Sequence, residues 1–350
     1  MFGGLFLVSV LATGSGIAVR QFLVESLGSP VFVVAAFVLG LTLALTVATF
    51  PLTFLTGWTL PSRFGLSTQS IGEWLRDWLK GVGISLVLAV GIVEVLYLLL
   101  AVAPTWWWLI SGALYVVFVV LLASLAPIIL LPLFFRFTPM PESSLTQRLE
   151  TLASRLGVRV RGVFQMELRA KTTAANAALM GIGHTRRIVL GDTLLDRFTD
   201  DEIEVVFAHE LGHQAHRDIV RLIATQSLLT MGSLFVCSVI LRIAVGPLGF
   251  TGLSDVANLP LLGLIIGATG ALTGPIGNAL SRGLERAADE FALQTTGATD
   301  AFISAMTRLA NQNLAEYDPD HWVELIFYDH PSIRSRIRLA ESFAKRPDQQ

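Results

Sequence analysis

The chain has 350 residues, of which 53% are hydrophobic and only 15% are charged. Because soluble domains carry about 25% charged residues, the composition excludes an ordinary water-soluble protein and predicts an integral membrane protein. The net charge of -2 leaves no basic excess for binding nucleic acid. The single cysteine, Cys237, excludes an intrachain disulfide and a zinc ribbon, and we expect it to be a lipid-facing or packed thiol.

Six apolar stretches are long enough to cross about 30 Å of hydrocarbon as helices. In chain order they are Phe2–Leu23, Val31–Trp58, Gly81–Ala103, Trp107–Phe135, Leu222–Val245 and Ala257–Leu280. The first is the weakest, because Arg20 and several small residues interrupt it. It lacks the basic start of a signal peptide, so we interpret it as an uncleaved span.

Basic residues between the spans predict the orientation. The loop 59–80 carries Arg63, Arg76 and Lys80, and the segment after the fourth span is rich in arginine from Arg136 onward. The turns near Pro104 and Gly249 contain no basic residue. By the positive-inside rule, the N-terminus, the loop 59–80, the long polar segment and the C-terminus lie in the cytoplasm.

The longest polar segment runs from Pro139 to Arg221 and mixes helical and strand patterns. Apolar residues at helical spacing predict a helix over Ser144–Leu156. Alternation predicts a strand over Val158–Leu168, and Arg187–Leu190 is a second short strand. Between these strands, the small and polar residues Lys171–Gly183 predict a strand edge and a turn.

A helix that begins after Thr199 is predicted next. Thr199 and Glu202 form a capping box, and Asp200 and Asp201 suit the positive end of a helix dipole. We expect this helix to continue towards the fifth span. The helix that begins after Thr199 is therefore expected to lead from the polar segment to the membrane.

The same helix contains the HExxH motif, with His209, Glu210 and His213. Residues four apart share one face of a helix, so the two imidazoles can bind one metal ion. Glu210 lies on the same turn and can reach a water molecule on that metal. The motif therefore predicts hydrolysis of an amide bond, against the alternative of two unrelated histidines on a solvated face.

A catalytic zinc site needs a third protein ligand and keeps one position for water. The metzincin pattern is excluded, because His216 and Ile219 stand where it needs Gly and His. Glu285 lies just beyond the sixth span, so it returns to the membrane face that carries His213. Asp289, four residues later, is placed to orient a ligand histidine. The alternatives are ion pairs of these carboxylates with neighbouring arginines.

Five short segments support a family resemblance, because they occur in order along most of the chain. They are Arg63–Lys80, Pro132–Pro139, Asn176–Leu195, Ser281–Ala292 and His330–Ile337. With the HExxH motif, they resemble the type I CAAX prenyl endopeptidases and, more loosely, the HtpX-like membrane metalloproteases. Both are gluzincins, in which a glutamate is the third zinc ligand.

The resemblance implies a role for each candidate site residue. His209, His213 and Glu285 would hold one zinc ion per chain, Glu210 would be the catalytic base, and Asp289 would support the site or help proton transfer. Asn176 and Ala177 would hold the extended substrate backbone. His330 and Arg336 would lie near the site, where His330 would stabilise the oxyanion and Arg336 would bind the substrate. Cobalt or manganese would also suit two histidines and a carboxylate.

The expected fold is mainly α, with about six transmembrane helices and a zincin-like α+β catalytic domain on the cytoplasmic side. Four parts are expected: a transmembrane region 1–138, a catalytic part 139–221, a membrane hairpin 222–282 and a second catalytic part 283–350. By resemblance, the spans would enclose an intramembrane chamber. Two differences from the family pattern concern this chamber. The chain has six expected spans, whereas eukaryotic relatives usually have seven, and Ser332 occupies a position where relatives often have proline.

Three functions are compared. The first is a zinc metalloendopeptidase that processes lipidated or membrane-associated peptides. The second is an HtpX-like quality-control protease that cleaves damaged membrane proteins. The third is a transporter or membrane scaffold without catalysis. The expected partners are a peptide or protein substrate and the lipid bilayer, without nucleic acid, and the short loops favour a prokaryotic plasma membrane.

Overall fold

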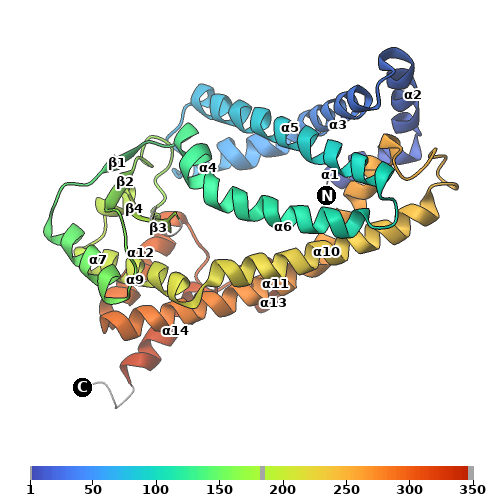
Figure 1. Cartoon of the computed structure of the whole chain (residues 1–350). Helices are drawn as coiled ribbons and strands as arrows, with labels where there is room; N and C mark the ends of the chain where they lie inside the picture. The colour runs from blue at the N-terminus through green and yellow to red at the C-terminus, as the bar shows by residue number, and fades with distance from the viewer. Residues whose placement is uncertain (1, 182–185, 346–350) are drawn as a thin grey trace. The chain divides into compact units, whose positions relative to one another are not determined.

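The structure is a computed structural model, which describes residues 2–181 and 186–345. The chain divides into two compact units. The membrane unit comprises residues 1–61, 70–118 and 226–273, and the sheet unit comprises residues 62–69, 119–225 and 274–350. Figure 1 labels the helices and strands of both units.

The only regular secondary structure among the described residues of the membrane unit is helical. It contains α1 (Phe2–Ala12), α2 (Ser15–Leu27), α3 (Pro30–Phe54), the π-helix η1 (Leu55–Thr59), α5 (Ile71–Val102), the first part of α6 (Trp107–Leu125), most of α10 (Asp218–Ala244), η5 (Val256–Asn258) and the first part of α11 (Leu259–Thr296). The short helix α4 (Leu60–Arg63) joins the two units in sequence.

Within the described residues, five helical segments are long and apolar enough to cross a membrane. They are Pro30–Arg63, Ile71–Val102, Trp107–Leu133, Asp218–Ala244 and Val256–Thr296. The expected first span is instead the pair α1 and α2, bent by 68° at a break next to Gly14. The expected six spans are therefore reached only when this bent pair counts as one. Arg20 of α2 pairs with the buried Asp255 at 3.5 Å, which explains how a charged residue is accommodated there.

The membrane unit has its own buried core. Trp107, Cys237 and Leu241 are fully buried in it, and the Tyr97 hydroxyl donates a hydrogen bond to the Asn258 side chain. Cys237 is thus a packed thiol and does not face lipid. The sequence allowed either a lipid-facing or a packed thiol, and the burial of Cys237 shows that it is packed.

The sheet unit contains a small mixed sheet in the order β1-β2-β4-β3. The strands are β1 (Phe137–Pro139), β2 (Val163–Met166), β3 (Ala177–Met180) and β4 (Arg187–Gly191). β2 and β4 run parallel, whereas β1 and β3 pair antiparallel with their neighbours. The strand predicted over Val158–Leu168 is shorter in the structure, where it forms only β2. The strand predicted at Arg187 is confirmed as β4. The strand edge predicted between them is β3, at the end of the sheet. Ile182 and Gly183 of the predicted turn lie outside the described residues.

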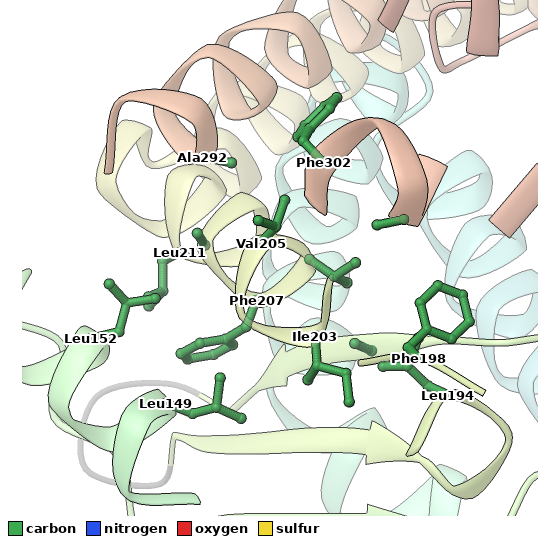
Figure 2. Packing of buried hydrophobic residues seen from close by; sticks show 14 of the residues in the cluster. Leu149, Leu152, Leu194, Phe198, Ile203, Val205, Phe207, Leu211, Ala292 and Phe302 are labelled. Carbon is green, nitrogen blue, oxygen red and sulfur yellow. The ribbon is translucent and has the colours of Figure 1, made fainter. Parts of the chain in front are cut away.

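The sheet unit also contains one largely buried helix, α9 (Asp200–His216), and several other helices. The other helices are η2 (Ala126–Leu130), η3 (Leu131–Leu133), α7 (Ser144–Arg155), α8 (Asp192–Leu195), α12 (Thr299–Asn313), α13 (His321–Phe327), α14 (Ile333–Ala344) and the second half of α11. Figure 2 shows α9 between Leu149 and Leu152 on one side and Ala292 and Phe302 on the other. Because α9 is buried almost all round, its position is held by packing from several elements at once.

Both ends of α9 are defined by particular residues. At its start, Thr199 accepts from the Glu202 N–H at 3.3 Å and Glu202 accepts from the Thr199 N–H at 2.8 Å, which confirms the capping box. At its end, Arg217 adopts a left-handed conformation with φ 55°, and α10 begins at Asp218. The prediction that α9 continues towards the fifth span is therefore wrong, because Arg217 breaks the helix.

The close approach of α9 to α11 depends on a glycine. A Cβ atom placed on Gly212 would lie 3.1 Å from Ala288 Cα and 3.3 Å from its carbonyl oxygen. Only a residue without a side chain lets the two backbones come this near. Gly212 directly precedes His213, and Ala288 lies between Glu285 and Asp289, so this contact brings the motif to the acidic helix.

Candidate metal centre and substrate cleft

Three side chains from two helices converge on one point of the sheet unit. His209 and His213 come from α9 and Glu285 comes from α11. His209 Nε2 lies 3.1 Å from His213 Nε2 and 3.2 Å from Glu285 Oε2, and His213 Nε2 lies 3.3 Å from Glu285 Oε1. The two imidazoles and the carboxylate therefore face a common centre.

This donor set fits a divalent metal ion. A tetrahedral ion with bonds of about 2.0–2.1 Å places its ligand atoms roughly 3.3 Å apart. The separations of 3.1, 3.2 and 3.3 Å are close to this value. Two histidines and one carboxylate supply three ligands and leave a fourth position for water, as in catalytic zinc sites.

Each histidine is oriented by a buried carboxylate. His209 Nδ1 lies 2.8 Å from Asp289 Oδ1, and His213 Nδ1 lies 2.9 Å from Asp218 Oδ2. An ionised carboxylate only accepts hydrogen bonds, so each Nδ1 carries the proton. Each Nε2 then keeps its lone pair for the metal.

Asp289 is itself held by Arg336 of α14. Arg336 Nε donates to Asp289 Oδ2 at 2.8 Å, and its Nη2 donates to Asp289 Oδ1. Asp289 is fully buried. Arg336, expected beside the substrate, is thus brought to the supporting carboxylate, and it also lines the cleft next to His209.

Asp218 is a candidate functional residue that the sequence interpretation missed. It lies five residues after His213, and in an unbroken helix this spacing places it about 140° away around the axis. The left-handed residue Arg217 redirects the chain, and the Asp218 carboxylate then reaches His213. The only sequence signal is an aspartate shortly after the motif, which is too common to identify it.

The site is electrostatically prepared for a cation. Burial alone would lower the pKa of His209, but its hydrogen bonds with Asp289 and Glu285 raise that pKa to about 9. Burial raises the pKa of the Glu210 carboxyl, against the opposing effect of the two histidines. Several carboxylates thus surround two imidazoles, and metal binding would release the protons that the imidazoles hold.

Glu210 and His330 complete the ring of groups around the centre. Both line a cleft of about 380 Å³ together with His209 and Glu285. His330 Nε2 lies 3.3 Å from Glu285 Oε1, and His330 Nδ1 lies 2.8 Å from Asp329 Oδ1. Its side chain is 54% exposed, so it stands at the open side of the site. His216 is elsewhere, packed edge-on against the Phe291 ring.

The edge of the sheet lies along the same cleft. Asn176 and Ala177 line it at the start of β3, which pairs with β4 and has no second partner among the described strands. Asn313 of α12 accepts from the Ala175 N–H at 3.0 Å and so holds the segment that leads into the edge. Sequence interpretation did not single out Asn313, since an amide at a helix end is ordinary. An extended peptide could pair with the free edge of β3.

The chain matches the sequence models of two known families. Residues 139–344 match the sequence model of peptidase family M48. Residues 1–136 match a model described as the CAAX prenyl protease N-terminal region, with five membrane helices. Together the two matches cover nearly the whole chain.

Individual relatives show the same relationship. The protein called "Uncharacterized metalloprotease YhfN" of Bacillus subtilis is 30% identical over 318 residues, covering 90% of this chain and 74% of the relative. A CAAX prenyl protease 1 homolog of Oryza sativa is 26% identical over 340 residues, covering 95% and 76%. The crystal structure of S. mikatae Ste24p has the same fold, with a TM-score of 0.83 and 23% identity, over 89% of this chain and 77% of that one.

These matches exclude the hypothesis of a non-catalytic scaffold or transporter. They also establish a multi-pass membrane protein, in agreement with the apolar helices of the structure. The chain belongs to peptidase family M48 and is a membrane metalloendopeptidase related to the CAAX prenyl proteases.

Proposed function

We propose that the chain binds one zinc ion through His209, His213 and Glu285 and uses it to hydrolyse peptide bonds. The observation that carries this proposal is the convergence of the three ligand atoms within 4.8 Å of one another, beside Glu210 in an open cleft. When bound, zinc supplies a Lewis acid that makes a water molecule acidic near neutral pH. Asp289 and Asp218 keep the two imidazoles in the tautomer that zinc requires.

Glu210 is the general base of the proposed reaction. Its raised pKa suits a carboxylate that takes a proton from water and later gives it to the leaving amine. Asp289 is a positioning residue, because it is fully buried and already bound to Arg336 and His209. His330, at the open side of the centre, donates to the oxyanion of the tetrahedral intermediate.

The substrate lies as an added strand along β3. Its backbone groups pair with the free edge near Ala177, and Asn176 holds it at the start of the strand. This mode recognises an extended backbone more than particular side chains. A peptide bond is thereby presented to the metal centre from the side of the cleft that β3 forms.

The proposed substrates are C-terminal peptides that carry a lipid. The support comes from the relatives named CAAX prenyl protease 1 homolog in Oryza sativa and Arabidopsis thaliana and from the membrane helices of the chain. A quality-control protease would instead cut unfolded membrane proteins without regard to a lipid. We also propose that the cleft faces the cytoplasm, which the arginine-rich segments on that side of the spans support.

The test uses the full-length protein in detergent with two reporter peptides of one sequence, farnesylated and unmodified. Wild-type protein is expected to cut the farnesylated peptide faster. Glu210→Gln is expected to lose cleavage by several orders of magnitude while it retains zinc, because only the base is removed. A chelator should abolish cleavage and added zinc should restore it.

Glu290→Gln serves as the matched control, since Glu290 lies on α11 in an ion pair with Arg286 and does not line the cleft. This variant should cleave like wild type. Equal rates on the two peptides would favour general proteolysis over processing of lipidated C-termini. Cleavage that survives in Glu210→Gln would contradict the assigned base.

A further inference from the structure

The short helix α13 presents its apolar side chains to the outside. Trp322, Leu325 and Phe327 are 59%, 50% and 67% exposed. The rings of Trp322 and Phe327 lie 6.5 Å apart between centroids, so they form one patch. An exposed patch of large apolar side chains marks a surface that contacts something other than water.

The single carboxylate of α13, Glu324, faces the protein instead, whereas His321 at the start of the helix is exposed. Glu324 Oε1 accepts from the Ser332 N–H at 2.9 Å. The carbonyl oxygens of Glu324 and Tyr328 accept from Arg282 of α11. This arrangement is the reverse of a helix on a water-exposed surface, where charged side chains point outward.

The hydrogen bonds between α13 and α11 indicate the depth of α13 relative to the membrane. Asn278 Nδ2 donates to the Ile326 carbonyl at 2.7 Å, and Arg282 Nη1 donates to the Glu324 carbonyl at 3.0 Å. No acidic residue, lysine or arginine lies between Asp255 and Arg282. Arg282 is therefore where this span leaves the hydrocarbon, and α13 is bound beside that point.

We propose that α13 lies in the boundary between the lipid headgroups and the acyl chains, with Trp322, Leu325 and Phe327 inserted. Aromatic rings prefer this layer of the bilayer. The contact is apolar and not electrostatic, because acidic residues flank the helix at Asp318, Asp320 and Asp329. The proposed partner is thus a lipid surface without net charge, such as zwitterionic phosphatidylcholine.

The contact has a consequence for the rim of the cleft. Tyr328 follows α13 directly, and Arg282 holds its carbonyl. His330 comes two residues later, with Nε2 at 3.3 Å from Glu285 Oε1. The bilayer would therefore support the segment that carries His330. The lipid contact itself does not depend on the proposed roles of the site residues.

The test is spin-label accessibility in phosphatidylcholine nanodiscs. Because Cys237 is the single cysteine, Cys237→Ala is the background, and Trp322→Cys, Leu325→Cys and Phe327→Cys are labelled one at a time. Collision with oxygen, which concentrates in hydrocarbon, is compared with collision with a water-soluble nickel chelate. We expect an oxygen-to-nickel ratio severalfold above that of a water-exposed site.

Two labelled positions calibrate the measurement. Thr151→Cys on α7 reports an exposed site of the sheet unit, and Val87→Cys reports the 74% exposed side chain of Val87 on the span α5. Labels on α13 that match Thr151 would overturn the proposal, because the patch would then be in water. Labels with little collision with either reagent would also overturn it, because protein would then cover the patch. Each variant is first shown to be monodisperse, and three label positions guard against one misfolded variant.

Discussion

At the scale of the residue, the two candidate histidine ligands differ in how their supporting carboxylates are held. Asp289 is fixed by two hydrogen bonds from Arg336, whereas Asp218 is fixed by the start of α10 and the left-handed residue before it. Both carboxylates are buried. The tautomer of each imidazole therefore depends on a single side chain.

Asp218→Ala should weaken zinc binding roughly 10–100-fold, because His213 loses the group that orients it and raises its basicity. Asp218→Asn keeps an oxygen that can accept the Nδ1–H and should recover part of the loss. Competition with a chromophoric chelator measures the affinity directly. Asp200→Ala, at the exposed start of α9, is the control and should bind zinc like wild type.

Glu202 should contribute to stability in a pH-dependent way. Burial would raise its pKa, but hydrogen bonds from Ser304 and the Thr199 N–H and the charge of Arg308 hold the pKa below the ordinary 4.5. A lowered pKa means that the stabilisation is present above pH 4.5 and is lost as the pH falls through the folded-state value. Glu202→Gln should therefore reduce the free energy of unfolding at neutral pH by about 1–3 kcal/mol and so lower Tm.

The measurement is thermal unfolding of both proteins from neutral pH to below pH 4. The difference in Tm should shrink as wild type loses the charge of Glu202. The exposed Glu150→Gln on α7 should leave Tm unchanged across the range. A difference that stays constant with pH would show that the ionised form of Glu202 is not what stabilises the fold.

At the scale of the element, the site depends on the contact between α9 and α11. Gly212 and Ala288 bring the two backbones together between the ligands of one helix and the acidic residues of the other. Gly212→Ala would place a methyl group 3.1 Å from Ala288 Cα. Because a backbone atom cannot move aside cheaply, we expect a loss of about 1–3 kcal/mol and weaker zinc binding.

Gly283→Ala is the matched control for this substitution. Gly283 lies on α11, and a Cβ atom there meets no atom within 4 Å. Its helix should become more stable by up to about 1 kcal/mol. Thermal unfolding and chelator competition on both variants separate the two effects, and similar behaviour of the two variants would contradict a tight contact at Gly212.

At the scale of the whole molecule, metal binding should couple distant parts of the chain. Glu285 is separated from His213 by α10 and most of the apolar part of α11, yet the three candidate ligands face one centre. A ligand that binds only the folded state stabilises it, by about 4 kcal/mol at a concentration 1,000 times its Kd. Chelation should therefore lower Tm, and added zinc should restore it.

His209→Ala is the control for this prediction. Without one of the two imidazoles, the site has lost an essential ligand, so the Tm of this variant should no longer respond to chelator or to added zinc. A zinc response as large as that of wild type would place the stabilising metal elsewhere in the protein.

Much of the fold and of the site could be predicted because local patterns carry the information. The 3.6-residue helical repeat joins His209 to His213, and long apolar runs reveal membrane helices whatever their packing. The edge strand and the capping box of α9 also follow from short segments. In contrast, the bend between α1 and α2 depends on Gly14 and on the neighbours of Arg20, which no local pattern shows.

By itself, the sequence determined the membrane class, the HExxH helix and the choice of Glu285 as the third candidate ligand. The first two follow from composition and from the spacing of residues along one helix, and the third follows from the position of Glu285 just beyond the sixth span. Only the tertiary structure decided that Arg217 ends α9, that Asp218 supports His213 and that the apolar face of α13 points outward. The reason is physical: a left-handed residue, a buried hydrogen bond and the outward side of a helix depend on neighbours that are distant in sequence.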